Sequence, residues 1–303
     1  MRAHLKAFTA VLIVGLLLAA LAAGQAGRRP GSETDIDRDR GMLLNVTAAR
    51  EDGSGERVTA KDVSLYDGGQ EQRIQAFTPD PSPARIVILV DNSLGLRADV
   101  EKLQRATREF AYEIYEGDQV MVVGFDQQPE IISDWTDDAK AVEASLTALR
   151  KKGQPHLFDA LTAVVDEALR PFAGSVRKRA IVLIGDGLDR GSKTKFKEAL
   201  AELQSSDIAV YAMQIPDRTG GAFRRDRPKP SEVVRQLAEG TGGRVLQLGN
   251  PREAAKSICD ELRKNRYLLA YTPSSVSYFD TRRLLVVGNP GVHLRFKTAQ
   301  PPN

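Results

Sequence analysis

The fold is decided by the stretch IVILVDNSLG, residues 86–95, in which an acidic loop directly follows an unbroken run of aliphatic residues. A second stretch, IVLIGDGLD at residues 181–189, repeats the arrangement. Continuous apolar strands are typical of a parallel sheet that is covered by helices on both faces. The carboxyl ends of such strands form the ligand-binding edge. We therefore expect Asp91, Ser93 and Asp186 to lie together on one rim.

Strand and helix patterns alternate between residues 84 and 265. Further strands are expected at 119–125, 130–135, 208–215 and 244–248, with 130–135 as a short edge strand. Amphipathic spacing predicts a helix that starts near Val100, and further helices over 138–149, 157–169, 192–204, 231–239 and 252–264. Alternation of this kind predicts an α/β domain with an open, doubly wound, mostly parallel sheet and helices on both faces.

Smaller β units are expected on both sides of this domain. Short strand-like pieces between turn-forming clusters predict a small β module over residues 41–80. Residues 266–303 return to β character and form a C-terminal tail. Because isolated hairpins are marginal in water, we expect the tail to pair with the module. Residues 27–40 are polar and charged, which predicts a disordered linker.

The first 26 residues predict export. Arg2, His4 and Lys6 precede an uncharged apolar stretch from Ala7 to Ala23, and small residues follow it. This pattern is typical of a secretory signal peptide. Retention of the same segment as an uncleaved membrane anchor is the alternative. We expect a periplasmic, cell-envelope or extracellular protein.

Charge and cysteine content exclude some functional classes. Without Arg2 and Lys6, the 43 Lys and Arg residues become 41, against 40 Asp and Glu residues. This near-neutral balance gives no support to nucleic-acid binding. The single cysteine, Cys259, cannot form an internal disulfide framework, and its helical apolar neighbours predict a buried thiol.

The acidic loops carry a family resemblance. An Asp-x-Ser pattern lies at the end of the first strand, and the segments Leu157 to Leu161 and Ile184 to Gly187 follow it. Because these segments come in the family's order, residues 84–265 resemble a von Willebrand factor type A domain. More narrowly, the whole chain looks like the secreted VWFA-related acidobacterial domain proteins. The segments behind that narrower resemblance are 63–69, 237–244 and 266–273.

The resemblance implies a metal-ion-dependent adhesion site at the rim. Asp91, Ser93 and Asp186 match the family's metal ligands for Mg²⁺ or Mn²⁺. Gly95 stands where the second serine belongs, and Pro155 stands where the threonine aligns. The loss of two hydroxyl ligands predicts a weak, degenerate cation site, and a rim that binds its partner without any ion is the alternative. Asp91 and Asp186 could also serve only to cap a helix or organise a turn.

Further residues are expected to surround this rim and contact a partner. Gly95 belongs to the first loop and Asp189 to the second. Asp159, inside the helix over 157–169, is expected to support the rim through hydrogen bonds. The basic loop from Pro216 to Pro230 leaves a strand end and should lie over the same rim, where it could select an acidic partner. Its arginines are Arg218, Arg224, Arg225 and Arg227.

These features favour an exported, non-catalytic, adhesion-type module that binds another protein through the rim. The two histidines beyond residue 26, His156 and His293, sit in no nucleophile motif, and no phosphate-binding loop or zinc spacing is present. One alternative is a metal-assisted hydrolase at the same aspartates. The other is a scaffold whose flanking β elements bind the partner.

Overall fold

The computed structural model describes residues 41–53, 55–218, 228–274 and 279–302. The predicted signal segment 1–26, the linker up to residue 40, and Arg224, Arg225 and Arg227 lie outside these residues. Among the residues that are described, no helix combines the length and the apolar character needed to cross a membrane.

A six-stranded sheet forms the centre of the described α/β region, in the order β10-β9-β8-β5-β6-β7. Its strands are β5 (Ala84–Asp91), β6 (Gln119–Phe125), β7 (Pro129–Thr136), β8 (Lys178–Gly185), β9 (Ala209–Gln214) and β10 (Val245–Gln247). Only the edge strand β7 runs antiparallel to its neighbour. The predicted doubly wound, mostly parallel sheet is confirmed, and the strand expected over 130–135 lies at its edge. This strand is not short, because β7 has eight residues, as many as β5 and β8.

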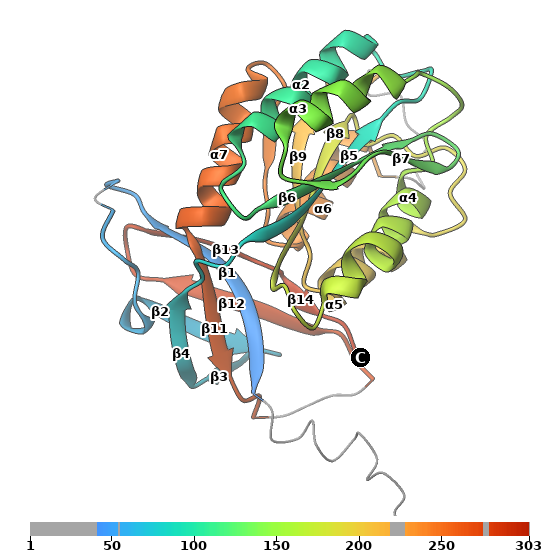
Figure 1. Ribbon diagram of the computed structural model, residues 1–303. Coiled ribbons are helices and arrows are strands. Elements are labelled where there is room, and N and C mark those ends of the chain that lie inside the picture. Colours follow the sequence, from blue (N-terminus) through green and yellow to red (C-terminus); the bar gives the residue numbers. More distant parts are fainter. Residues whose placement is uncertain (1–40, 54, 219–227, 275–278, 303) are drawn as a thin grey trace, which may run out of the picture. The chain divides into compact units, whose positions relative to one another are not determined.

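Helices cover both faces of this sheet (Figure 1). One face carries α2 (Val100–Glu113), α3 (Ala139–Ser145) with the 3₁₀ turn η2 (Leu146–Ala148), and α7 (Pro251–Lys264). The other face carries α4 (Leu157–Ala163), the π-helical turn η3 (Val164–Leu169), α5 (Phe196–Ser205) and α6 (Pro230–Gly240). A 3₁₀ turn, η4 (Arg170–Phe172), leads from η3 toward β8.

The sequence of β5 explains why two layers of helices are needed. Ile86, Ile88 and Val90 belong to the cluster on the α2 face, whereas Val87 and Leu89 belong to the cluster on the α4 face. All five side chains are fully buried. A strand that is apolar at every position is stable only where both faces of the sheet are shielded from water.

The sheet order also fixes where a site can form. From β5 the chain moves to β6 on one side, while β8, β9 and β10 lie on the other side. The carboxyl ends of β5 and β8 therefore flank a topological switch point, where open α/β sheets bind their ligands.

The strands at the two ends of the chain form two further sheets. The first has the order β13-β1-β11-β4, and the second has the order β14-β12-β2-β3. From the N-terminal part come β1 (Met42–Arg50), the 3₁₀ turn η1 (Ala60–Asp62), β2 (Val63–Asp67), β3 (Gln70–Gln72) and β4 (Ile74–Pro79). From the C-terminal part come β11 (Arg266–Tyr271), β12 (Arg282–Gly288), β13 (Val292–Phe296) and β14 (Ala299–Gln300).

Pairing between the two ends of the chain is confirmed. Strand β1 lies between β11 and β13, and β2 pairs with β12, all antiparallel. The two sheets share one apolar cluster that includes Leu44, Leu65, Phe77, Tyr267 and Leu284. Neither end supplies a complete core alone, because each contributes only part of this cluster.

Buried polar contacts join these strands to the α/β region. The Glu261 carboxylate on α7 accepts a hydrogen bond from the Tyr211 hydroxyl at 2.8 Å and pairs with Arg295 of β13. It also pairs with Arg244 at 2.9 Å. Lys297 Nζ donates to the carbonyl of Gln204 at 3.0 Å. Because these groups are largely shielded from water, each depends on its partner.

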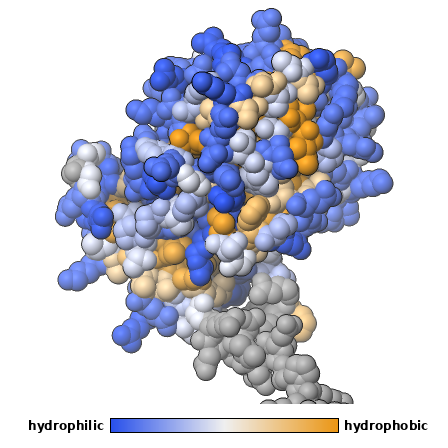
Figure 2. All heavy atoms as spheres, viewed as in Figure 1, coloured by the Kyte–Doolittle hydropathy of each residue, from blue (hydrophilic) through white to orange (hydrophobic). Residues whose placement is uncertain are grey.

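The visible surface is mostly hydrophilic, with apolar side chains in small, separate patches (Figure 2). Seven large apolar residues of the described chain are well exposed: Leu43, Leu94, Tyr112, Ile131, Phe279, Leu285 and Val287. Single exposed apolar residues are common, so their position in the fold decides whether they matter.

Candidate functional site at the carboxyl edge of the sheet

The rim contains two deeply buried carboxylates. Asp91 is the last residue of β5 and is 1% exposed, and Asp186 directly follows β8 and is fully buried. Asp91 Oδ1 accepts hydrogen bonds from the Ser93 backbone N–H at 2.9 Å and from the Ser93 hydroxyl at 2.6 Å. Asp186 Oδ1 accepts the Leu188 N–H at 3.0 Å. Each loop thus folds back onto its own aspartate.

Arg218 brings these residues together. Its Nη2 donates to Asp91 Oδ2 at 2.6 Å and to Asp186 Oδ1 at 2.7 Å, and its Nε pairs with Asp186 Oδ2. Its Nη1 donates to Ser93 Oγ at 3.1 Å. The Arg218 side chain is only 7% exposed. The predicted meeting of Asp91, Ser93 and Asp186 on one rim therefore occurs around a guanidinium group.

The sequence predicted that the basic loop lies over the rim, but it did not assign a separate role to Arg218. Its contacts to Asp91 and Ser93 span more than a hundred residues of sequence. One sequence signal does exist, because Arg218 follows closely after β9, the strand beside β8 in the sheet. The carboxyl end of that strand opens onto the same edge as the two aspartates.

Burial and charge act against each other in this cluster. Burial raises the pKa of the Asp91 carboxyl, and the Arg218 guanidinium and Ser93 oppose this shift without cancelling it. Burial also disfavours the charged guanidinium, but hydrogen bonds and charges from Asp186 and Asp91 outweigh this effect, so the pKa of Arg218 is raised. Two carboxylates and one guanidinium leave one negative charge, which the N–H groups of Ser93 and Leu188 help to offset.

Gly95 supplies the space that Arg218 occupies. A Cβ atom at this position would lie 3.0 Å from Arg218 Nη1 and 3.9 Å from its Cδ. Gly95 is not among the residues with positive φ, so its backbone would accept other residues. The need for glycine here is steric and comes from the arginine.

The residues of the rim do not fit a divalent cation while Arg218 is in place. All four carboxylate oxygens of Asp91 and Asp186 already accept hydrogen bonds from Arg218, Ser93 or Leu188. Mg²⁺ requires near-octahedral oxygen coordination, which would need these same oxygens. Across the described part of the chain, no group of three or more His, Cys, Asp or Glu residues is arranged to hold a metal. The Mg²⁺ or Mn²⁺ site stays a prediction.

Asp159 and Asp189 hold the second loop against the start of α4. Asp159 accepts hydrogen bonds from the backbone N–H groups of Lys193 at 3.0 Å and Thr194 at 2.8 Å. Asp189 pairs with the Ser192 hydroxyl and accepts the Phe158 N–H at 3.4 Å. Both carboxylates thus bind backbone or loop groups, and their expected contact with a partner stays a prediction.

Leu94 is the apolar side chain that this rim presents to solvent, with 66% of its surface exposed. Its backbone is fixed, because the Leu94 N–H donates to the Gly153 carbonyl at 3.2 Å and Ser93 forms a parallel bridge with Lys152. Asn92 Nδ2 adds a hydrogen bond to the carbonyl of Arg150 at 2.8 Å. The exposed leucine therefore projects from an ordered loop.

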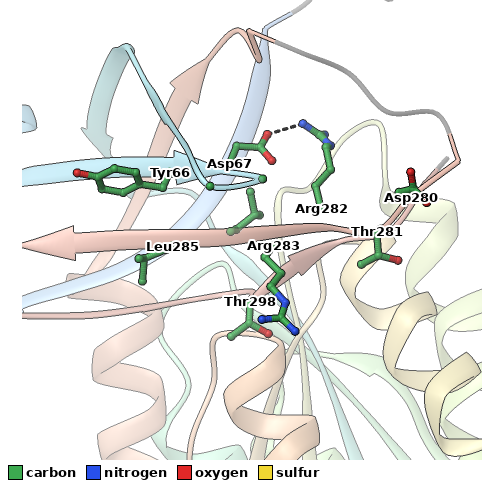
Figure 3. A pocket seen from close by; sticks show the side chains of 11 residues that line it. Tyr66, Asp67, Asp280, Thr281, Arg282, Arg283, Leu285 and Thr298 are labelled. Atoms are coloured by element: carbon green, nitrogen blue, oxygen red, sulfur yellow. Dashed lines mark hydrogen bonds and ion pairs between the residues drawn. The ribbon is translucent and has the colours of Figure 1, made fainter.

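A second candidate location lies on the flanking strands. An open hollow of about 880 Å³ is lined by residues of β2, β12 and the segments beside them. Figure 3 shows Arg282 pointing toward Asp67 beside this hollow, where the two form an ion pair. The Asp67 carboxylate also accepts the Tyr271 hydroxyl at 2.9 Å. Asp67 and Arg282, two of the charged residues that line the hollow, are thus paired with each other.

Comparisons with known proteins bear on the α/β region. Residues 86–188 match the model of the von Willebrand factor type A domain. No curated protein matches the chain in sequence. Among solved structures, an aerotolerance-related membrane protein from Bacteroides fragilis is 23% identical, with a TM-score of 0.46 over 60% of this chain and 99% of that one. A von Willebrand factor type A protein from Catenulispora acidiphila is 11% identical, with a TM-score of 0.49 over 88% of this chain and 75% of that one.

The family match covers Asp91, Ser93 and Asp186 of the rim but not Arg218. It begins with the apolar residues of β5 and ends just after Asp186, so it includes both acidic loops except for Asp189. The narrower acidobacterial grouping stays a prediction. Residues 86–188 of this chain thus match a von Willebrand factor type A domain, in agreement with the fold and with the resemblance seen in the sequence.

Proposed function

We propose that this chain is an exported, non-catalytic module that binds another protein through the rim at the carboxyl ends of β5 and β8. The observation that carries the proposal is Leu94, an exposed apolar side chain held by an ordered loop at the switch point. An aliphatic side chain of this kind can act as an anchor when it enters a pocket on the partner. Ordering the loop before binding also lowers the entropic cost of association.

The chemistry of the rim supports binding rather than catalysis. Ser93 Oγ donates to Asp91 and accepts from Arg218, so the hydroxyl and the carboxylate beside it are both held in an ion-paired cluster. His293 pairs with Glu51 at 3.0 Å on the flanking strands. No observation favours the alternative of a metal-assisted hydrolase.

Export is part of the proposal and rests on residues 1–26, whose basic start and apolar stretch are typical of a secretory signal. The partner is then a protein of the periplasm, the envelope or the exterior. Because Arg218 already supplies a positive charge to both aspartates, we expect partner capture to survive chelation of divalent ions. A weak Mg²⁺ or Mn²⁺ site would instead make capture sensitive to a chelator.

The second candidate function uses the flanking strands, where Leu285 of β12 is 53% exposed and lines the open hollow. This exposure gives a matched pair of variants, Leu94→Glu at the rim and Leu285→Glu on β12. Both changes affect exposed side chains and should alter folding stability by no more than about 0.5 kcal/mol.

The test is capture of partners from envelope extract by wild type and both variants, with and without chelator. We expect Leu94→Glu to weaken capture of the same partner at least about tenfold, with Leu285→Glu unchanged. The reverse result would assign binding to the flanking strands. Undiminished capture by both variants would contradict both candidates.

A further inference from the structure

We infer that Arg218 is a built-in cation that takes the place of a divalent ion at this rim, and that Gly95 is the residue that admits it. The inference concerns the cation alone, and it stands whether or not Leu94 contacts a partner.

The first step is the match between the guanidinium and the donor set. Arg218 directs Nε, Nη1 and Nη2 at Asp186, Asp91 and Ser93, the residues that the family resemblance assigns to the metal. A planar guanidinium with several fixed donors suits carboxylate oxygens and stays charged at any physiological pH. Arg218 therefore meets, within the chain, the demand for positive charge that two buried carboxylates create.

The second step is the exchange at Gly95. The family's motif has a serine at this position, and its hydroxyl would face the cation. Here the Cβ of such a serine would lie 3.0 Å from Arg218 Nη1, a contact tighter than nine in ten of those that real Cβ atoms make, so the guanidinium would have to shift. A serine at position 95 would therefore lie too close to the Arg218 guanidinium in its observed position. The missing hydroxyl and the inserted arginine are then two parts of one structural replacement.

The replacement of the ion by Arg218 changes which groups the rim can offer to a partner. A bound divalent ion keeps coordination positions that water or a partner's carboxylate can fill. Arg218 is 7% exposed and uses its donors within the cluster, so it offers no comparable open position. Contact with a partner at this rim would therefore involve neighbouring exposed groups and would not use a carboxylate bound to a metal.

The experiment is a titration with Mn²⁺ alone, followed by calorimetry and by thermal melting, on six proteins: wild type, Arg218→Ala, Gly95→Ser/Arg218→Ala, Arg235→Ala, and Asp91→Asn in wild type and in the double variant. Arg235 is the matched control, because it is an exposed arginine on α6 that pairs with Glu232 and Glu239. We expect no binding by wild type or by the control. Arg218→Ala should bind Mn²⁺ with a Kd at least about tenfold below the highest Mn²⁺ concentration at which wild type shows no binding, and the double variant should bind more tightly again. Asp91→Asn in the double variant should remove the gain.

Two results would overturn the inference. One is Mn²⁺ binding by wild type that Asp91→Asn abolishes. The other is an Arg218→Ala protein that circular dichroism shows to be folded and that still binds no Mn²⁺. If Arg218→Ala folds only with Mn²⁺ present, the inference is supported, since the ion then replaces the arginine. If the Arg218→Ala protein folds neither with nor without Mn²⁺, the titration of wild type is the test. Absence of Mn²⁺ binding by wild type then supports the replacement of the ion by Arg218, and Mn²⁺ binding by wild type refutes it.

Discussion

At the scale of single residues, Arg218 converts two buried carboxylates into a stable part of the rim. Asp91 and Asp186 are almost completely shielded from water, and such charges are costly without a partner. The guanidinium contacts both, and Ser93 links the first loop to the same group. Removing any one of these groups leaves the others buried with unmet hydrogen bonds, so the cluster should respond to mutation as a unit.

The first prediction is that Gly95 and Arg218 are energetically coupled. Gly95→Ser should destabilise the wild-type protein by about 1 kcal/mol, because the new Cβ would lie 3.0 Å from Arg218 Nη1 and the guanidinium must shift by a few tenths of an ångström from its contacts. In an Arg218→Ala background the same change should cost much less, because the obstructing atoms are gone. Urea unfolding of the four proteins of this double-mutant cycle measures the coupling.

The comparison that tests this cycle is Gly249→Ser, since a Cβ at Gly249 would meet no atom within 4 Å. This control should show the same stability change with and without Arg218. A coupling between Gly95 and Arg218 no larger than that of the control would show that position 95 does not depend on the arginine.

The rim residues differ in how far sequence alone could place them. Asp91, Ser93 and Asp186 follow from the strand ends, because a continuous apolar run fixes where a buried strand stops. Arg218 does not follow in the same way, since its pairing depends on the path of a loop and on side-chain direction. Local pattern carries no information on either. The sequence marks Gly95 as a missing hydroxyl ligand, but only the structure shows that this glycine lies beside Arg218.

At the scale of the elements, hydrophobic periodicity predicted which segments are helices better than where they begin. The helix expected over 192–204 is α5, which starts at Phe196. The carboxylate of Asp159 binds the N–H groups of Lys193 and Thr194, which keeps this stretch in a loop. Apolar spacing cannot reveal this contact, because it comes from another helix. The helix over 157–169 changes to a π-helical turn at Val164, a change of hydrogen-bond pattern that apolar spacing does not encode.

The second prediction concerns this contact between α4 and the second acidic loop. Asp159→Ala should remove two hydrogen bonds to a charged acceptor and destabilise the protein by about 1–2 kcal/mol. The amide hydrogens of Lys193 and Thr194 should then exchange faster with solvent, while those in β8 keep their protection. Hydrogen exchange followed by mass spectrometry or NMR provides the measurement.

The matched control for this prediction is Asp166→Ala, an exposed carboxylate of η3 that pairs with Arg170. Loss of the Asp166 carboxylate should leave hydrogen exchange in the second loop unchanged, because surface ion pairs contribute little to folding stability. Equal exchange rates at Lys193 in the Asp159 variant and in wild type would show that the loop is held by other contacts.

In the molecule as a whole, strands from the two ends of the described residues pair with each other. Strand β1 near the start of the described residues is flanked by β11 and β13 from the end, with the α/β region inserted between them. Sequence predicted this pairing from the marginal stability of isolated hairpins. It could not predict the buried polar groups that join the parts, such as Glu261 and Lys178, because charged residues at strand and helix ends usually face water.

Lys178 is the clearest of these groups. It is the first residue of β8 and is 1% exposed, and its Nζ donates to the carbonyls of Asp80 at 2.7 Å and Leu262 at 3.1 Å. Asp80 follows β4 of the flanking sheets and Leu262 lies in α7, so this lysine joins the two regions at their junction. Burial lowers the pKa of Lys178 from its usual value of 10.5 to about 8, although nearby Asp80 and Asp118 oppose the shift.

The third prediction is a gain in stability at alkaline pH that depends on Lys178. Between about pH 8 and pH 10.5 the unfolded chain keeps the lysine proton that the folded protein has released. The unfolded state then binds more protons, so raising the pH across this window should favour folding, by about 2 kcal/mol for this one group.

Other titrating residues also change stability with pH, and the comparison of wild type with Lys178→Met isolates the contribution of Lys178. Urea unfolding at a series of pH values should show the wild type gaining on this variant from pH 8 upward, with little change in the difference below that. Lys197→Met, at an exposed lysine of α5, should show no such trend against wild type. A difference between wild type and Lys178→Met that stays constant from pH 7 to 10.5 would mean that Lys178 titrates as it does in the unfolded chain, and that its burial at the junction costs the folded protein little.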